Sequence, residues 1–209
     1  MNEHLDNLRE IRNLMERSSK FLSLSGLSGV FAGLVALIGA GRVYFKKVEL
    51  TSSYNVTGIF SAKNMAEPGE FKTFLIQTAI ITFLAALFFG IYFTVRKASK
   101  NGDKLWNPLS KKLVASLVIP LFAGAVFAIV LIQQLNYTLA ASSTLVFYGL
   151  ALLGASHFTV RDVYFLGLFE VILGILSIAF VGYSLLFWAL GFGVLHIVYG
   201  LLMYLKYDK

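Results

Sequence analysis

The chain of 209 residues contains no cysteine and only 3 prolines, and charged side chains make up only 14% of it. Without cysteine, the protein can form neither disulfides nor thiolate metal sites, and thiol catalysis is excluded. Soluble domains carry about 25% charged residues, so this chain has too few charges to cover a globule in water. Hydrophobic residues instead make up 57% of the sequence, which predicts that most of the protein surface faces lipid.

Catalytic motifs are missing as well. The sequence has no HExxH, Walker-loop or GxSxG motif, and these motifs place the groups on which metal, phosphate or serine chemistry depends. The centres of the apolar runs offer only Glu170 and His196 as metal ligands, fewer than the three or four of a usual site. We therefore expect no cofactor and no metal, and we predict that the protein is not an enzyme. A membrane enzyme that lacks these motifs is the third alternative to the two hypotheses below.

The positive charge of the chain does not indicate nucleic-acid binding. The formal net charge is +7, but most basic residues flank apolar runs, where they orient helices in a bilayer. No basic stripe is interleaved with aromatic residues, as a nucleic-acid surface would require. We therefore expect the lipid bilayer, and no nucleic acid, as the partner of this charge.

Six apolar runs reach about 20 residues, the length at which an α-helix spans a hydrocarbon core. They lie at about 21–44, 71–95, 109–135, 139–155, 159–181 and 184–206. Asn107 followed by Pro108 is typical of a helix start. The longest connection, 45–69, is predicted to be a loop because it holds the helix breakers Ser52, Ser53, Asn55, Gly58 and Pro68. The runs predict an all-α integral membrane bundle of six transmembrane helices, a single domain over residues 21–209.

Residues 1–20 precede the first run and are predicted to form an amphipathic helix on the cytoplasmic side. Leu5, Leu8, Ile11 and Met15 recur at helical spacing over residues 2–19, and charged residues occupy the other face. One interpretation is a helix lying at the membrane interface. The other is a docking helix that, together with the basic segment 96–112, contacts a cytoplasmic protein partner. An oligomer is equally compatible with the sequence.

The basic residues also predict an orientation. When the six runs are threaded through a membrane in order, 13 of the 18 Lys and Arg residues fall on the side of the N-terminus. The exceptions are Arg42, Lys46, Lys47, Lys63 and Lys72. Since cytoplasmic loops carry the excess of basic residues, we predict a multi-pass protein with both termini in the cytoplasm.

The last two runs each carry one ionisable residue, Glu170 and His196, near their centres. Each has a glycine three residues before it and another four residues after it, namely Gly167, Gly174, Gly193 and Gly200. Residues at these spacings share one face of a helix, so both polar groups are predicted to lie on glycine stripes where two backbones approach closely. Both lie about 15 Å from the inner end of their helix, near the midplane of a core about 30 Å thick. We therefore predict that they meet.

Two interpretations of this pair remain open. A lone charge at the bilayer centre costs about 2.5–3.5 kcal/mol. Burial therefore favours the neutral forms of Glu170 and His196, whereas pairing of the two residues favours their charged forms. The pair is therefore a candidate for proton exchange or ligand binding. The alternative is a satisfied polar pair that fixes helix register, worth about 0.6 kcal/mol per hydrogen bond. Further candidates for a polar lining are Tyr148, Ser142, Ser143 and Gln77, and Gly29 and Gly33 are candidates for helix packing.

Two functional hypotheses follow. The first is a small-solute or proton-linked transporter, or a solute-binding membrane component, that uses Glu170 and His196. The second is a non-transporting membrane subunit or regulator that docks a cytoplasmic partner. An internal repeat would favour the first: residues 30–40 resemble 146–155, and 118–124 resemble 194–200, in the same order. Shared composition explains such short matches equally well.

Overall fold

The computed structural model describes residues 24–53, 68–102, 105–180 and 182–208, and it contains helices and no strand in these ranges. Six of its helices are long and apolar enough to cross a membrane, as the sequence predicts. Five are continuous, and the sixth span consists of α7, the π-helical turn η3 and α8. The bounds are α2 (Gly26–Ser53), α3 (Pro68–Asn101), α4 (Pro108–Gln133), α5 (Tyr137–Ala155), α6 (Asp162–Ala179), α7 (Ser184–Trp188), η3 (Ala189–Leu195) and α8 (His196–Tyr207), with a 3₁₀ turn η2 (Ser156–Phe158) after α5.

Most predicted helix limits agree with these bounds to within a few residues, but the predicted loop over 45–69 begins too early. α2 continues to Ser53 and α3 already begins at Pro68. Residues 45–50 contain no breaker, and Lys46 stabilises the extension because its Nζ lies 3.4 Å from Glu49 and 3.1 Å from Glu70 of α3. Residues 54–67 and the amphipathic helix predicted over 2–19 lie outside the described residues.

The predicted start of α4 is confirmed. Asn107 is the N-cap, and its side-chain oxygen accepts a hydrogen bond from the backbone N–H of Ser110 at 2.8 Å. The Ser110 hydroxyl accepts in turn from the backbone N–H of Asn107 at 2.9 Å. Pro108 follows at the first helical position, where its missing N–H costs nothing.

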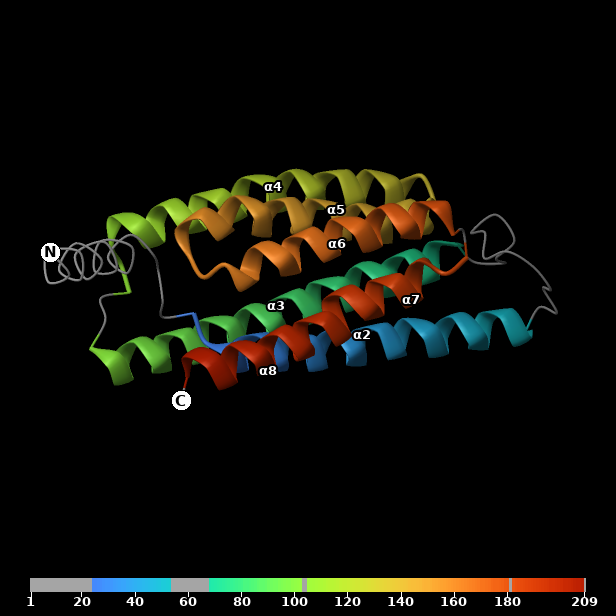
Figure 1. The fold of residues 1–209 in the computed structure, drawn as a ribbon. Helices are drawn as coiled ribbons and strands as arrows, with labels where there is room; N and C mark the ends of the chain where they lie inside the picture. The colour runs from blue at the N-terminus through green and yellow to red at the C-terminus, as the bar shows by residue number, and fades with distance from the viewer. Residues whose placement is uncertain (1–23, 54–67, 103–104, 181, 209) are drawn as a thin grey trace, which may run out of the picture.

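The helices form two layers (Figure 1). In one layer α2 packs between α3 and the sixth span, and in the other α5 packs between α4 and α6. Contacts of α7 and η3 with α5 and α6 join the two layers. α3 has its main contact with α2, and its many exposed large apolar side chains make it suited to face lipid.

The same pairing pattern occurs in both halves of the chain. α2 packs on the helix after it and on the last span, and α5 packs on the helix after it and on α4, the last span of the first half. The sequence matches align Gly124 with Gly200, and Val146–Phe147 with Val30–Phe31. A Cβ atom on Gly124 would lie against the Phe147 side chain, and one on Gly200 would lie against the backbone of Val30, one position away in the match. The two halves therefore share a pattern of helix pairing but not the same glycine contacts.

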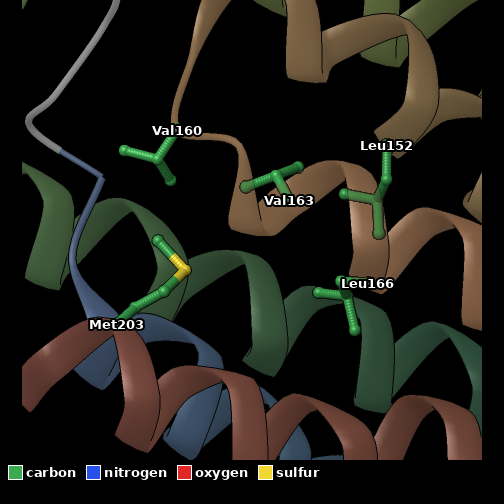
Figure 2. Packing of buried hydrophobic residues seen from close by; sticks show 5 residues of the cluster. All are labelled: Leu152, Val160, Val163, Leu166 and Met203. Atoms are coloured by element: carbon green, nitrogen blue, oxygen red, sulfur yellow. The ribbon is translucent and has the colours of Figure 1, made fainter. Parts of the chain in front are cut away.

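Apolar side chains hold the layers together at the end of the bundle where α8 finishes. Figure 2 shows Met203 of α8 opposite Val163 and Leu166 of α6, with Val160 and Leu152 beside them. All of these side chains are buried. Each buried side chain of this size contributes about 1.5–3 kcal/mol when it leaves water, although lipid as the alternative environment reduces that gain.

Asp208 ties the end of α8 to the start of α2 and the end of α3. Its Oδ1 lies 2.6 Å from Nζ of Lys97. Its Oδ2 accepts hydrogen bonds from the Ser25 hydroxyl at 2.9 Å and from the backbone N–H of Gly26 at 3.0 Å. A carboxylate at the N-terminus of α2 satisfies an otherwise free N–H group and complements the helix dipole. The three helices of this layer are thereby fixed at one end.

Candidate functional site: a buried acid and an imidazole beside a π-helical turn

Glu170 and His196 meet between the two layers. Glu170 projects from the middle of α6 and His196 is the first residue of α8. Oε1 of Glu170 lies 3.3 Å from Nδ1 of His196. The glutamate is 0% exposed and the histidine 6%. The predicted meeting of these two residues is confirmed.

Two further groups determine the state of the His196 ring. Nδ1 lies 3.0 Å from the carbonyl oxygen of Gly191, and Nε2 lies 2.8 Å from the hydroxyl of Tyr148. A carbonyl can only accept, so Nδ1 carries the hydrogen and donates it. Nε2 of the neutral ring then accepts from the Tyr148 hydroxyl. The surroundings thus select the tautomer, and Tyr148, predicted as a lining residue, belongs to the site.

Glu170 itself is under-bonded. Neither of its carboxyl oxygens has a hydrogen-bond partner among the described residues, because the Nδ1–H of His196 is directed at the Gly191 carbonyl. A buried polar group without a partner costs about 1–3 kcal/mol, and a charged one costs more. No hydrogen bond from the described residues therefore offsets the burial of this carboxyl group.

A π-helical turn places Gly191 against this carboxyl group. η3 interrupts the sixth span over Ala189–Leu195, and a Cβ atom on Gly191 would lie 2.5 Å from Oε2 of Glu170. π-helical turns are rare and occur often at functional sites. The sequence analysis missed this residue; the pair Gly191 and Gly193, shortly before the histidine in an apolar run, was the signal available.

The four glycines that flank Glu170 and His196 pack closely against other helices, as predicted, but they do not line a seam between the last two spans. A Cβ atom on Gly167 would meet the Gly149 carbonyl of α5 at 2.8 Å, and one on Gly174 would also meet α5. Gly193 and Gly200 instead face Leu37, Val30 and other atoms of α2. The physical reason is that α6 and α8 lie in different layers, and each glycine stripe serves the packing within its own layer. Only Gly191 opens the contact between Glu170 and the sixth span.

The two glycines of the first span do pack closely, as predicted. A Cβ atom on Gly29 would lie 3.1 Å from Cα of Gly200, and one on Gly33 would lie 2.6 Å from the carbonyl oxygen of Gly193. Backbone meets backbone here, so no side chain can move aside. The small residues set the distance between α2 and the sixth span.

The other predicted lining residues lie in different places, and none of them forms a hydrogen bond with the Glu170–His196 pair. Ser142 of α5 shares a 2.7 Å hydrogen bond with Ser177 of α6, two turns beyond Glu170. Ser143 is buried and donates to the Ala140 carbonyl of its own helix at 2.8 Å. Gln77 is exposed on α3 and is not brought to the pair. Sequence reasoning overlooked Ser177, a hydroxyl seven residues from Glu170 on the same apolar helix.

Fold and site together define a class: an all-helical protein with six helices of membrane-spanning length and a buried carboxyl–imidazole–phenol chain between two layers. Comparisons of the chain with protein-family models, with curated proteins and with solved structures found no match.

Proposed function

We propose that this chain is a multi-pass integral membrane protein, with both termini cytoplasmic, that transports a small solute coupled to proton movement through Glu170. The observation that carries the proposal is the fully buried carboxyl group whose two oxygens lack hydrogen-bond partners while an imidazole lies 3.3 Å away. A pair that only fixed helix register would satisfy both groups. An ionisable residue left under-bonded at this depth is typical of a proton or ligand site.

The hydrogen-bond chain supports a proton path. Tyr148 donates to Nε2 of His196 in the neutral ring, and a phenol can also accept. Tyr148 can pass its hydroxyl proton to Nε2 and take up a replacement proton on its other side, while Nδ1 releases its own proton to the carboxylate Oε1 of Glu170. The ring returns to the neutral state with its hydrogen on the other nitrogen. One proton has then moved from the Tyr148 side to Glu170.

The interrupted sixth span supports a conformational step. Transporters place their sites where helices are broken near the midplane and between structural repeats. Here η3 breaks the sixth span directly beside Glu170, and the pairing of helices repeats between the two halves of the chain. A change in η3 would move His196 relative to Glu170 without unfolding α8.

A carbodiimide tests whether Glu170 binds protons. Dicyclohexylcarbodiimide enters membranes and reacts with protonated carboxyl groups, and the modified residue is identified by mass spectrometry. We expect modification of Glu170 that falls as pH rises and disappears in Glu170→Gln. Glu49 and Glu70, with side chains 65% and 54% exposed, serve as controls outside the buried site. An unmodified Glu170 at every pH would contradict the proposal.

Cysteine accessibility tests alternating access. Because the chain has no cysteine, Ser177→Cys introduces a single thiol next to the site, and Thr78→Cys provides a buried control on α3. We expect the thiol at position 177 to react with a water-soluble thiosulfonate, at a rate that changes when a pH gradient across the membrane is reversed. The thiol at position 78 should stay protected. Protection of both thiols from both sides would favour the non-transporting subunit that docks a partner through residues 2–19 and 96–112.

A further inference from the structure

Aromatic rings lead from one end of the bundle to the Glu170–His196 pair. Trp188, Phe192 and His196 follow one another at four-residue spacing along the sixth span, so they share a face. The Trp188 and Phe192 rings are 4.9 Å apart between centroids, and the Phe192 and His196 rings 6.0 Å. Tyr148 of α5 lies opposite, 5.0 Å from Phe192 and 5.3 Å from His196. We call these rings of Trp188, Phe192 and Tyr148 the aromatic ladder.

The ladder becomes more buried toward the acid. Trp188, Phe192 and Tyr148 are partly exposed, whereas His196 is buried and Glu170 fully so. The indole N–H of Trp188 is used in a hydrogen bond to the Thr144 hydroxyl at 3.2 Å, which holds that ring in place. Phe192 is the direct neighbour of Gly191, the residue in contact with the Glu170 carboxyl group. The rings therefore extend from the partly exposed Trp188 to His196, which lies beside the carboxyl group.

This combination selects one chemical class of ligand. Aromatic faces attract cations by their quadrupole, worth about 0.5–2 kcal/mol per contact, and a buried carboxylate binds a positive charge strongly in a medium of low dielectric. Anions are repelled by both features, and a neutral solute would leave the carboxylate charge uncompensated. The described groups offer few donors and acceptors beyond those already used within the site, so a strongly hydrated ion gains little here.

We propose that the site takes a small organic cation, a substituted ammonium, which displaces the proton of Glu170. This inference rests on the proposed proton coupling and names its substrate class. The exchange is balanced: the protonated carboxyl group releases one proton, and the cation occupies the resulting carboxylate. The titratable groups that face Glu170 are His196 of the sixth span and Tyr148 of α5. The ligand reaches the carboxylate when η3 and the His196 ring move away from α6.

Phenyltrimethylammonium and its uncharged carbon isostere tert-butylbenzene form the matched pair of probes. The protein has two tryptophans, and Trp106 lies in the turn before α4, so Trp106→Phe leaves Trp188 as the fluorescent reporter. In purified full-length protein we expect saturable quenching of Trp188 by phenyltrimethylammonium only. In weak buffer we expect the release of about one proton per bound cation.

Variants separate the two parts of the site. Phe192→Leu should weaken cation binding about 5–30-fold, the equivalent of one lost cation–π contact of about 1–2 kcal/mol, and Phe192→Trp should restore it. Glu170→Gln should abolish both saturable quenching and proton release. Phe127→Leu on the lipid-facing α4 removes a ring that pairs with Phe147 of α5 and should change neither quenching nor proton release.

The experiments separate the organic-cation site from the proton coupling through Glu170 on which it rests. Equal binding of tert-butylbenzene, or cation binding that is unchanged in Glu170→Gln, overturns the organic-cation site. If Glu170 reacts with carbodiimide and Ser177→Cys shows gradient-dependent access while the cation does not bind, proton coupling stands and the substrate class is wrong. If carbodiimide also fails to modify Glu170, both fall.

Discussion

Gly191 lies so close to Glu170 that a Cβ atom on it would stand 2.5 Å from the carboxyl Oε2. The same residue offers its carbonyl to Nδ1 of His196 at 3.0 Å. One glycine thus brings the sixth span against the acid and at the same time directs the imidazole hydrogen away from it. The unsatisfied state of Glu170 follows from this double role.

Gly191→Ala should therefore disturb the site more than an ordinary helix substitution. The methyl group would press on the Glu170 carboxyl and on Leu145, whose Cδ2 it would approach to 2.6 Å. We expect a loss of about 1–3 kcal/mol in the free energy of unfolding, as for other overpacked positions, measured by denaturation in detergent. Gly90→Ala is the control, because no atom lies within 4 Å of its added Cβ. Equal stability of the two variants would show that the contact is not close in the protein.

Tyr148→Phe should remove the donor to His196 Nε2 and leave this buried nitrogen unpaired. We expect the free energy of unfolding to fall by about 0.5–2 kcal/mol. This range covers the values for hydrogen bonds in membrane proteins and for buried hydrogen bonds in soluble proteins. ¹⁵N NMR provides a sharper readout, since the chain has only three histidines. The His196 signals should show hydrogen on Nδ1 in the native protein, and the Nε2 signal should shift in the variant. Hydrogen on Nε2 in the native neutral ring would contradict the assigned tautomer.

Gly33→Ala should separate α2 from the sixth span. Its Cβ would lie 2.6 Å from the backbone carbonyl of Gly193, and backbone cannot give way as a side chain can. We expect the free energy of unfolding to fall by about 1–3 kcal/mol, which would be measured as a lower unfolding temperature in detergent. Gly41→Ala on the same helix has no atom within 4 Å of its added Cβ, and it should be neutral or slightly stabilising because alanine favours helix.

Asp208→Asn should destabilise the protein because it removes a carboxylate that joins three helices. The substitution leaves Lys97, whose side chain is only 10% exposed, without its ion-pair partner. Removing one partner of a buried ion pair lowers the free energy of unfolding by about 3 kcal/mol. Asp162→Asn is the comparison, since its partner Lys206 has a side chain 58% exposed and exposed pairs contribute about 0–1 kcal/mol. Thermal unfolding of both variants measures the difference. An Asp208→Asn variant no less stable than Asp162→Asn would show that the Lys97 pair contributes little.

Much of the fold was readable from local patterns. Six apolar runs predicted the six long helices, and the Asn107–Pro108 pair predicted the start of α4. The predicted loop over 45–69 began too early because an apolar run shows which part of a helix suits lipid, whereas the helix itself can continue beyond that run into polar residues. α3, with 34 residues, extends to about 51 Å and is longer than a core of about 30 Å requires.

The site was only half predictable. Glu170, His196 and Tyr148 stood out because a polar side chain in an apolar run needs a partner. Glu170 and His196 were also predicted to meet, since both lie at about the same distance from the inner end of their helix. Glycines were assigned to the wrong neighbours, since the spacing of residues along one helix shows which of them share a face but not which helix that face meets. Gly191, Ser177 and the aromatic ladder became visible only when α5, α6 and the sixth span lay together.

The amino-acid sequence alone determined the number of long apolar helices, their order and the two ionisable residues at matching depth, because hydrophobic length and helical periodicity are local properties. Tertiary structure decided the two layers, the tautomer of His196 and the unpaired state of Glu170. Each of these depends on which backbone lies opposite which side chain, and that is set by the packing of helices remote in the chain. Whether the Glu170 carboxyl group received the imidazole hydrogen was decided there, by the carbonyl group of a single glycine.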